Sequence, residues 1–501
     1  MQFARRLHLF AIIFVVIISV DISRAQEANK ITINWDKTVK VSKTNATLQV
    51  VVNPPLRRGT PVHDNAYAAV RDLQADFVRY VPWLPYPKLG VAELEPPKDG
   101  KTFWDFTLID PMTIDFLEAT KGHSVILNFS TIPQWMFKDD KPATYPDDPN
   151  LAVWTYEHGH ELRDPSGKEV ADYFARILSW YTQGGFTDEL GKRHDSGHHF
   201  SIPYWEVLNE PELEHQVDAE MYTRIYDEAV TAMHKVSPQT KFLGVSLAYP
   251  SNNPHFFEYF LDAKNHKPGV PLDYISYHFY AIPSNDETAE NQQFSFFAQA
   301  EGFLNTVRFI EAIRLRLSPN TGTMVNEIGA ISADDLVQGD PGHVTKPIPG
   351  SYWNLAGAMY AYIFSELTHI GIDVAGESQL VGYPTQFPSV SMVDWENGKP
   401  NPRFWVLKLL HDNFGPGDKL VDTQFVRGYV YASAVITRDG KKRVLLINKR
   451  DRPFEISVPG ASGGQQSYVD GSTGFQPPAS SKLASDKISL AGFSVSVVTL
   501  P

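Results

Sequence analysis

Two hydrophobic patterns alternate along this chain, and together they predict repeated strand–helix units. Short apolar runs that stop at Asn, Pro or Gly are typical of buried strands, whereas apolar positions three or four residues apart are typical of helices packed on a sheet. The runs that we interpret as strands cover residues 48–52, 77–81, 124–129, 204–208, 241–245, 274–278, 323–329 and 372–375. Helices are expected over residues 66–73, 106–119, 170–180, 222–233, 256–261, 303–313, 355–367 and 405–413. This order predicts an α/β fold, a (β/α)8 TIM barrel spanning residues 48–414.

The pattern changes after Gly415-Pro416-Gly417, where turn residues mark a domain boundary. Apolar residues alternate with polar ones over residues 430–437 and 443–447, which is typical of strands with one buried face. Asp439-Gly440 lies between these two runs and predicts a hairpin with a type I′ turn. Residues 415–501 are therefore expected to form a C-terminal β-sandwich domain.

The first 25 residues predict an export signal that is not part of the fold. Arg5 and Arg6 precede an apolar run over residues 9–20, and Ser23 and Ala25 are the small residues that signal peptidase reads. The mature protein is then secreted or periplasmic. Because a bilayer-spanning helix needs about 20 apolar residues, no membrane anchor is expected. The chain contains no cysteine, so disulfides and thiol chemistry are excluded.

Charge narrows the possible partners. The formal net charge of −13 is unsuited to nucleic acid or an anionic membrane, since both attract concentrated Lys and Arg. His194, His198 and His199 lie in a loop before the fourth strand, where a metal site is one interpretation and solvated histidines are the simpler one. We expect no cofactor and no catalytic metal, and the oligomeric state stays open.

Two glutamates follow apolar runs at matching places in the predicted barrel. Tyr204-Trp205-Glu206-Val207-Leu208-Asn209-Glu210-Pro211 reads as the fourth strand, which delivers Glu210 at its carboxyl end. Thr323-Met324-Val325-Asn326-Glu327-Ile328-Gly329 reads as the seventh strand and delivers Glu327. The separation of 327 − 210 = 117 residues fits about three βα units of ~35 to 40 residues. Because catalytic groups of TIM barrels lie at the carboxyl ends of strands, the pair predicts one site.

Paired carboxyl groups are what glycoside hydrolysis requires. One protonates the departing oxygen, and the other meets the positive charge that develops at the anomeric carbon. A gap of about 5 to 5.5 Å between them gives direct attack and retention, whereas ~6.5 to 9.5 Å admits water and gives inversion. For a single Glu, a surface or strand-capping role is the alternative, but two such motifs favour catalysis.

The two motifs resemble the signatures of retaining glycoside hydrolases of clan A, and most closely family 39, which contains β-xylosidases and α-L-iduronidases. The resemblance implies a retaining enzyme with Glu210 as acid/base and Glu327 as nucleophile. It also implies that Asn209 holds the sugar 2-hydroxyl, with a turn-forming Asn as the alternative. Residues 26–47 are expected to be extended. In proteins that this chain resembles, such a segment can add a strand to the β-sandwich.

Further candidates come from neighbouring strand ends. Arg79 on the second strand could keep Glu327 ionised through a charge-assisted hydrogen bond. His278 and Tyr280 resemble the clan's His-x-Tyr pattern, whose Tyr contacts the nucleophile. An ordinary ion pair or a packed aromatic ring is the alternative for each of the three. Aromatic rings that could stack on sugars occur in the expected loops, at Trp83, Trp135, Trp154 and Trp395, and we select Trp135 for the site.

Three other glutamates lie close to the first motif. Glu206 shares strand parity with Glu210, but it should lie about 13 Å below the barrel mouth, so we interpret it as structural. Glu212 and Glu214 follow in a loop and are expected to be solvated.

These observations predict a secreted retaining glycoside hydrolase that cleaves O-glycosidic bonds by double displacement. A β-xylosidase-like or related exo-glycosidase acting on fragments of plant or microbial polysaccharides is the interpretation we adopt, with an oligosaccharide or glycoside as the partner. A non-catalytic carbohydrate-binding barrel and a transglycosylase are the alternatives. A metal-dependent barrel hydrolase would need ligands such as two His after the first strand, where Asn53-Pro54-Pro55 stands instead. Xylosides, uronides and arabinosides are not distinguished by the sequence.

Overall fold

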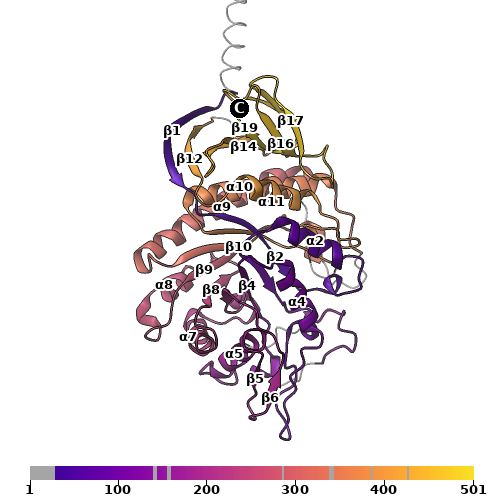
Figure 1. The fold of residues 1–501 in the computed structure, drawn as a ribbon, viewed down its shortest axis with the longest axis vertical. Coiled ribbons are helices and arrows are strands. Elements are labelled where there is room, and N and C mark those ends of the chain that lie inside the picture. Colours follow the sequence, from indigo (N-terminus) through magenta and orange to yellow (C-terminus); the bar gives the residue numbers. More distant parts are fainter. Residues whose placement is uncertain are drawn as a thin grey trace, which may run out of the picture.

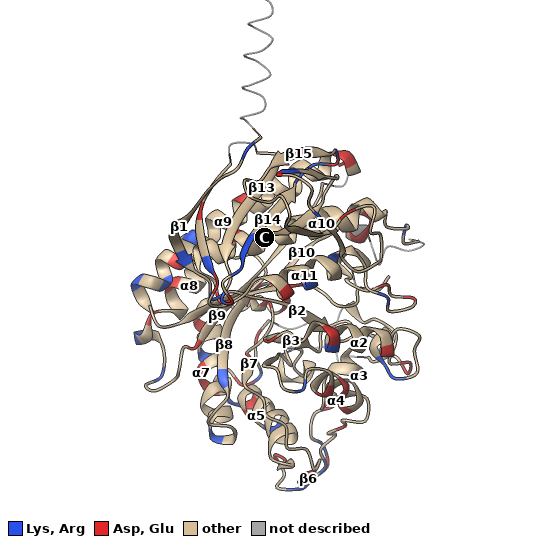
Figure 2. Cartoon of the chain, turned by 45° about the horizontal axis from the view of Figure 1, so that its top comes forward, with Lys and Arg blue, Asp and Glu red and all other residues tan. Residues whose placement is uncertain are grey.

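The computed structural model describes residues 29–138, 144–154, 160–284, 287–337, 344–384, 387–425 and 428–501. A barrel with surrounding helices forms one end of the molecule, and a mainly antiparallel β domain forms the other (Figure 1). The predicted signal peptide, residues 1–25, lies outside the described residues. Acidic and basic side chains are both scattered over the helices and loops that surround the barrel (Figure 2).

The barrel is closed by eight parallel strands, and the predicted (β/α)8 fold is confirmed. Around the barrel the strands follow in the order β2 (Asn45–Val51), β3 (Val78–Val81), β4 (Val125–Leu127), β7 (Tyr204–Glu206), β8 (Lys241–Leu247), β9 (Tyr274–Ala281), β10 (Gly322–Ala330) and β11 (Val374–Glu377). Each strand pairs with the next in parallel register, and β11 returns to β2, where Glu377 lies opposite Leu48. All carboxyl ends therefore meet at one mouth.

The main helices of the barrel lie close to the expected positions. They are α2 (His63–Leu73), α4 (Ile109–Ala119), α5 (Lys168–Thr182), α7 (Ala219–Val236), α8 (Pro254–Phe260), α9 (Ala289–Leu317), α10 (Gly350–Ile370) and α11 (Pro402–Asn413). The apolar stripe of α7 is buried against the barrel wall, as its spacing predicts. None of the helices in the described part of the chain has the length and apolar character that crossing a membrane requires.

Helix α10 connects the two parts of the molecule. Its residues are buried on nearly every side, because α10 and α11 lie between the barrel and the C-terminal domain (Figure 1). Leu445, Ile447, Val495 and Val497 of the C-terminal domain belong to the same apolar cluster as the barrel core. The C-terminal sheet thus shares part of the barrel core, and a second apolar cluster, which includes Ile31, Val444 and Val498, lies within the C-terminal domain.

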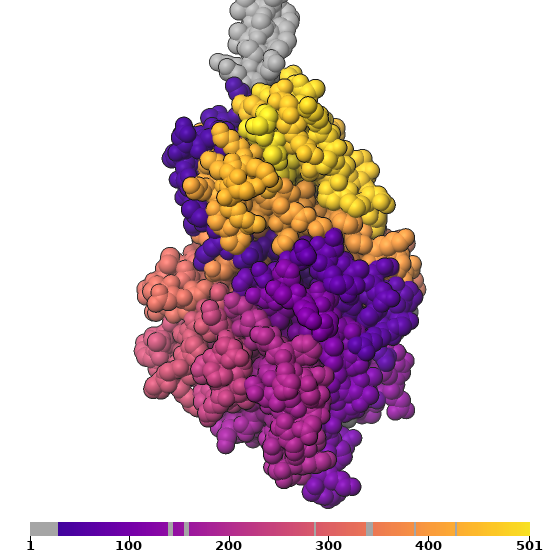
Figure 3. Space-filling view, in the orientation of Figure 1, coloured from indigo at the N-terminus to yellow at the C-terminus, as the bar shows by residue number. Residues whose placement is uncertain are grey.

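The C-terminal domain contains a seven-stranded sheet. Its order is β1 (Thr32–Val41), β12 (Lys419–Gln424), β13 (Val430–Ile436), β14 (Lys442–Asn448), β19 (Val495–Thr499), β16 (Gln465–Val469) and β17 (Ala479–Lys482). A smaller two-stranded sheet joins β15 (Phe454–Ser457) to β18 (Lys487–Leu490). Strand β1 pairs antiparallel with β12, so a segment before the barrel completes the C-terminal sheet, as the indigo and orange surfaces side by side show (Figure 3).

One turn differs from the prediction. A type I′ turn at Asp439-Gly440 needs positive φ at both residues, but only Gly440 has one, with φ +83. The amide of Gly440 donates to the carbonyl oxygen of Thr437, and the amide of Thr437 donates to that of Lys441. The hairpin therefore has a longer loop that ends in a left-handed glycine, and the type I′ prediction is wrong.

Candidate active site

Glu210 is presented by a sharp turn at the end of β7. Leu208 and Glu210 have positive φ values of 63 and 43, a left-handed conformation that non-glycine residues rarely adopt. The turn is held because the Glu210 amide donates to the carbonyl oxygen of Ser246, 2.9 Å away, at the end of β8. Pro211 then begins the short helix α6 (Pro211–Glu214). The strained backbone directs the Glu210 side chain to the barrel mouth.

Glu327 is held on both carboxylate oxygens. Arg79 of β3 donates to Oε1 from Nη1 at 2.5 Å, and the Tyr280 hydroxyl of β9 donates to Oε2 at 2.6 Å. Strand β10 carries Glu327 itself, and only 7% of its side chain is exposed. A cation and a hydroxyl on the two oxygens orient this carboxylate toward the cavity.

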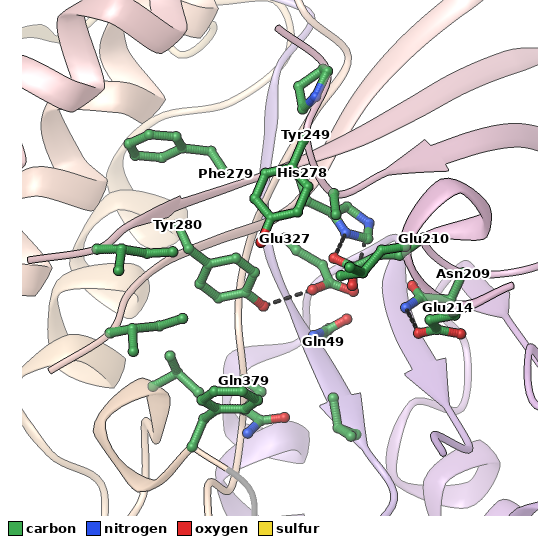
Figure 4. A pocket seen from close by; sticks show the side chains of 18 of the residues that line it. Gln49, Asn209, Glu210, Glu214, Tyr249, His278, Phe279, Tyr280, Glu327 and Gln379 are labelled. Carbon is green, nitrogen blue, oxygen red and sulfur yellow. Dashed lines mark hydrogen bonds and ion pairs between the residues drawn. The ribbon is translucent and has the colours of Figure 1, made fainter. Parts of the chain in front are cut away.

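His278 links the two glutamates. Its Nδ1 lies 2.8 Å from Oε1 of Glu210, and its Nε2 lies 3.5 Å from Oε1 of Glu327. One carboxylate oxygen of each glutamate and one ring nitrogen of His278 all lie within 4.8 Å of one another. Figure 4 shows the two carboxylates side by side beneath His278, with Tyr280 approaching Glu327 from the opposite side. The strand ends thus bring together two carboxyl groups that are 117 residues apart in sequence, as 327 − 210.

A buried ion pair forms the floor of the site. The five N–H groups of Arg79 meet five acceptors, and the Arg79 side chain is 1% exposed. These acceptors are Glu206 Oε2, Gln49 Oε1, Glu327 Oε1, Asn209 Oδ1 and Ser246 Oγ. Glu206 in turn accepts from Ser276, Asn326 and Asn128 as well as from Arg79. Glu206 is therefore a positioning residue that fixes the orientation of Arg79 beneath Glu327.

The surroundings of Glu210 and His278 shift the pKa of both groups. Burial raises the pKa of Glu210 above its usual range, the contact with His278 opposes this rise, and the charge of Glu327 adds to it. Burial alone would lower the pKa of His278, but Glu327 and Glu210 outweigh it and raise that pKa. A carboxyl group whose pKa is raised, such as that of Glu210, can hold a proton and act as an acid.

The same three side chains have the spacing of a cation site. However, Glu327 already accepts from Arg79 and Tyr280, and Nδ1 of His278 is bound to Glu210. The Arg79 guanidinium already supplies a positive charge to the Glu327 carboxylate, so a metal ion is not needed to balance it. The donor set fits paired acid and base groups better than it fits a metal.

A cavity of about 670 Å³ opens above the two glutamates. Glu210, His278, Tyr280 and Glu327 line it, together with Asn209 and the rings of Trp83, Trp154, Tyr249 and Phe387. Trp83 and Trp154 contact each other edge to face, with ring centroids 5.6 Å apart. Two tryptophans and a tyrosine therefore provide apolar walls on which a sugar ring could stack.

Trp135 does not line this cavity among the described residues. Its indole donates to the carbonyl oxygen of Glu93, and the Arg163 guanidinium lies 4.7 Å from the ring centroid. The structure therefore places Trp135, which we predicted as a sugar contact, outside this cavity, because its ring is packed by these neighbours. Trp83 and Trp154 occupy the cavity wall instead.

The expectation that Glu214 is solvated is also wrong. Glu214 is 2% exposed, because helix α6 folds it back beneath the turn that carries Glu210. Its Oε1 accepts from Asn209 Nδ2 and Trp83 Nε1, each at 2.7 Å. Burial, followed by the charge of Glu210, raises its pKa well above the usual range. Glu214 and Gln49 are lining residues that sequence reasoning missed, although the polar Gln49 in an apolar strand was a usable signal.

Comparison with known proteins adds a fold relationship. No protein-family model matches the chain, and no curated protein matches it in sequence. The GH51 arabinofuranosidase from Xanthomonas axonopodis pv. citri is 13% identical with a TM-score of 0.62, over 94% of this chain and 99% of that one. The α-L-arabinofuranosidase from Thermotoga maritima is 15% identical with a TM-score of 0.60, over 94% and 99%. A glucosidase from Croceicoccus marinus is 15% identical with a TM-score of 0.58, over 94% and 98%.

At these low identities, the TM-scores and the coverage show a shared fold and nothing finer. The similar structures are clan A glycoside hydrolases, so the clan that the two motifs resemble is also the clan whose fold this chain adopts. Membership of family 39 is not shown by them.

Proposed function

We propose that this protein is a retaining glycoside hydrolase that cleaves O-glycosidic bonds by double displacement. The observation that carries the proposal is the pair Glu210 and Glu327, of which one carboxylate oxygen each lies within 4.8 Å of the other at the barrel mouth. That separation is nearer to the ~5 to 5.5 Å spacing of retaining enzymes than to the ~6.5 to 9.5 Å spacing of inverting ones, which supports direct attack by one glutamate. Residues 1–25 would direct the enzyme out of the cytoplasm.

In this mechanism the two glutamates have different tasks. Glu327, oriented by Arg79 and Tyr280, attacks the anomeric carbon and forms a glycosyl–enzyme ester. Glu210, with its raised pKa, donates its proton to the departing oxygen in the same step. Glu210 then takes a proton from water, which attacks the anomeric carbon and releases the sugar with its original configuration.

The proposal also includes the class of glycoside that the enzyme cleaves. The β-xylosidase-like or related exo-glycosidase activity is supported by the family 39 resemblance of the two motifs. The arabinofuranosidase and glucosidase named among the similar structures suggest further neutral glycosides to test. Transglycosylation would use the same residues with a sugar in place of water. A binding protein without activity has no use for two carboxyl groups held in different environments.

The test combines activity with covalent labelling. We expect wild-type protein to hydrolyse at least one aryl glycoside from a panel of xylosides, arabinosides and glucosides, and Glu327→Gln to lose about 10⁴-fold or more in kcat/KM. A 2-deoxy-2-fluoro glycoside of the active sugar should label Glu327, which mass spectrometry of a peptic digest would locate. NMR of the first-formed sugar should show the retained anomer. Inactivity on all aryl glycosides and oligosaccharides would refute the enzyme proposal, and an inverted product would refute the mechanism.

A further inference from the structure

The cavity is lined by acidic groups without a free cation to balance them. Three of its lining residues are carboxylic acids, Glu210, Glu214 and Glu327. Among the described residues that line it, none is Lys or Arg. His278 is the basic group present, and its two ring nitrogens already face Glu210 and the Ser246 hydroxyl. A bound anion would therefore find no unused positive partner on this wall.

Arg79 lies directly below the cavity but cannot serve an anionic ligand. All five of its N–H groups are directed to protein acceptors, two of them carboxylates. Its side chain is 1% exposed. To bind a substrate carboxylate, Arg79 would have to release Glu327 or Glu206, which would disturb the nucleophile that it orients.

Glu214 has a carboxyl oxygen that is buried and has no hydrogen-bond partner in the described structure. Its Oε1 accepts from Asn209 and Trp83, whereas its Oε2 is buried and has no hydrogen-bond partner in the described structure. Figure 4 shows Glu214 beside Asn209 at the edge of the cavity that Glu210 shares. A buried polar atom without a partner destabilises the free protein, and a ligand hydroxyl would satisfy it.

We propose that the sugar bound at the catalytic glutamates is uncharged and that Glu214 hydrogen-bonds one of its hydroxyl groups. This inference rests on the glycosidase function proposed above and narrows its substrate class to neutral glycosides, excluding uronides. A uronide carboxylate would face the Glu327 anion without a compensating cation, and repulsion at this range in a poorly solvated cavity is strong. Because burial favours the protonated form of Glu214, its free Oε2 can carry the proton and donate it to a sugar oxygen.

The substrate class is tested with matched substrates that share one leaving group. The panel pairs p-nitrophenyl β-D-glucoside with the β-D-glucuronide, and the β-D-galactoside with the β-D-galacturonide, alongside the β-D-xyloside and α-L-arabinofuranoside. We expect kcat/KM for the best neutral member to exceed that of either uronide by at least 100-fold. A uronide cleaved within 100-fold of the best neutral glycoside would overturn the inference while leaving the glycosidase function intact. If no member is cleaved, the proposed function itself fails.

The role of Glu214 is tested with two variants and a control. Glu214→Ala should lower kcat/KM on the best neutral glycoside at least tenfold, and Glu214→Gln, which can reproduce both the acceptor and the donor of a protonated carboxyl, should stay within threefold of wild type. Glu220→Gln removes a charge from an exposed glutamate of α7 outside the cavity and serves as the matched control.

Monodeoxy analogues distinguish a sugar contact from a merely structural role. If Glu214 binds a hydroxyl, the Glu214→Ala penalty should fall below threefold on the one analogue that lacks this hydroxyl. An equal penalty on every deoxy analogue would overturn the contact, because a structural defect affects all substrates alike. A Glu214→Gln variant as impaired as Glu214→Ala would overturn it as well.

Discussion

Two buried arginine–glutamate pairs of similar chemistry and different roles lie next to opposite ends of strand β10. At the carboxyl end, Arg79 of β3 is buried beneath Glu327 of β10, and Glu327 lines a cavity of about 670 Å³. At the amino end, Arg314 and Glu311 are three residues apart on helix α9, and Thr323 at the start of β10 donates to Glu311 at 2.5 Å. Both pairs are largely buried, with 8% or less of each residue exposed.

The difference lies in what the arginine does with its donors. Arg314 binds Glu311 with Nε and Nη2 and caps the carbonyl oxygens of Pro319 and Thr321 with Nη1, so it fastens the end of α9 to the next strand. Arg79 instead gathers groups from several barrel strands around one carboxylate. A buried ion pair alone therefore does not mark a functional site. The cavity beside it and the convergence of strand ends do.

Removing a glutamate from each end gives the largest expected contrast. Glu210→Ala should lower kcat/KM by about 10² to 10⁴ on aryl glycosides with poor leaving groups, because these need protonation, and by less on those with good ones. Azide should partly rescue the variant. Glu311→Ala should leave kcat/KM within a few-fold of wild type and lower the free energy of unfolding by about 2 kcal/mol, since Arg314 loses its partner. Steady-state kinetics with a leaving-group series, and urea unfolding, measure the two effects.

An equal loss across leaving groups without rescue by azide would assign Glu210 another role. A loss of activity in Glu311→Ala beyond a few-fold would show that the amino end of β10 also shapes the site.

The sequence predicted the fold because each barrel strand is a short apolar run with turn residues after it. Residues 124–129 and 241–245 needed no tertiary information to be recognised, since a strand buried on both faces is apolar throughout. The boundaries were less determined. Strand β7 was expected to continue to residue 208, but the left-handed conformation of Leu208 ends it at Glu206.

The residues of the candidate site likewise fall into those that the sequence predicted and those that it did not. Arg79, His278, Tyr280 and Glu327 lie on barrel strands and Glu210 follows one, so closure of the barrel brings them together. Trp135 and Glu214 were misplaced because both lie in connections, where side-chain direction depends on the path of the backbone and not on a repeating pattern. A short helix after Pro211, which buries Glu214, has no periodicity that a sequence of four residues can reveal.

Exchanging each arginine for lysine gives an intermediate contrast. Arg79→Lys keeps the positive charge but supplies at most three donors in place of five, so Glu327 should lose its fixed orientation and kcat should fall about 100-fold. Arg314→Lys should leave kcat unchanged and lower the unfolding temperature by a few degrees. Kinetics and thermal unfolding monitored by circular dichroism report both variants. The comparison would fail if Arg79→Lys kept full activity, or if the two variants lost the same fraction of kcat.

The smallest expected effect is on the pH dependence of kcat/KM. It should distinguish Glu210, near the carboxyl end of β10, from Glu311, near the amino end. Burial raises the pKa of Glu210, which must hold a proton to assist the leaving group, so kcat/KM should fall as pH rises through that pKa, by at most about tenfold per pH unit. Because Glu210 and His278 are hydrogen-bonded, the apparent pKa belongs to the pair. Glu210→Gln should abolish this alkaline limb on substrates with good leaving groups, whereas Glu311→Gln should keep it. An alkaline limb that survives unchanged in Glu210→Gln would assign the acid to another residue.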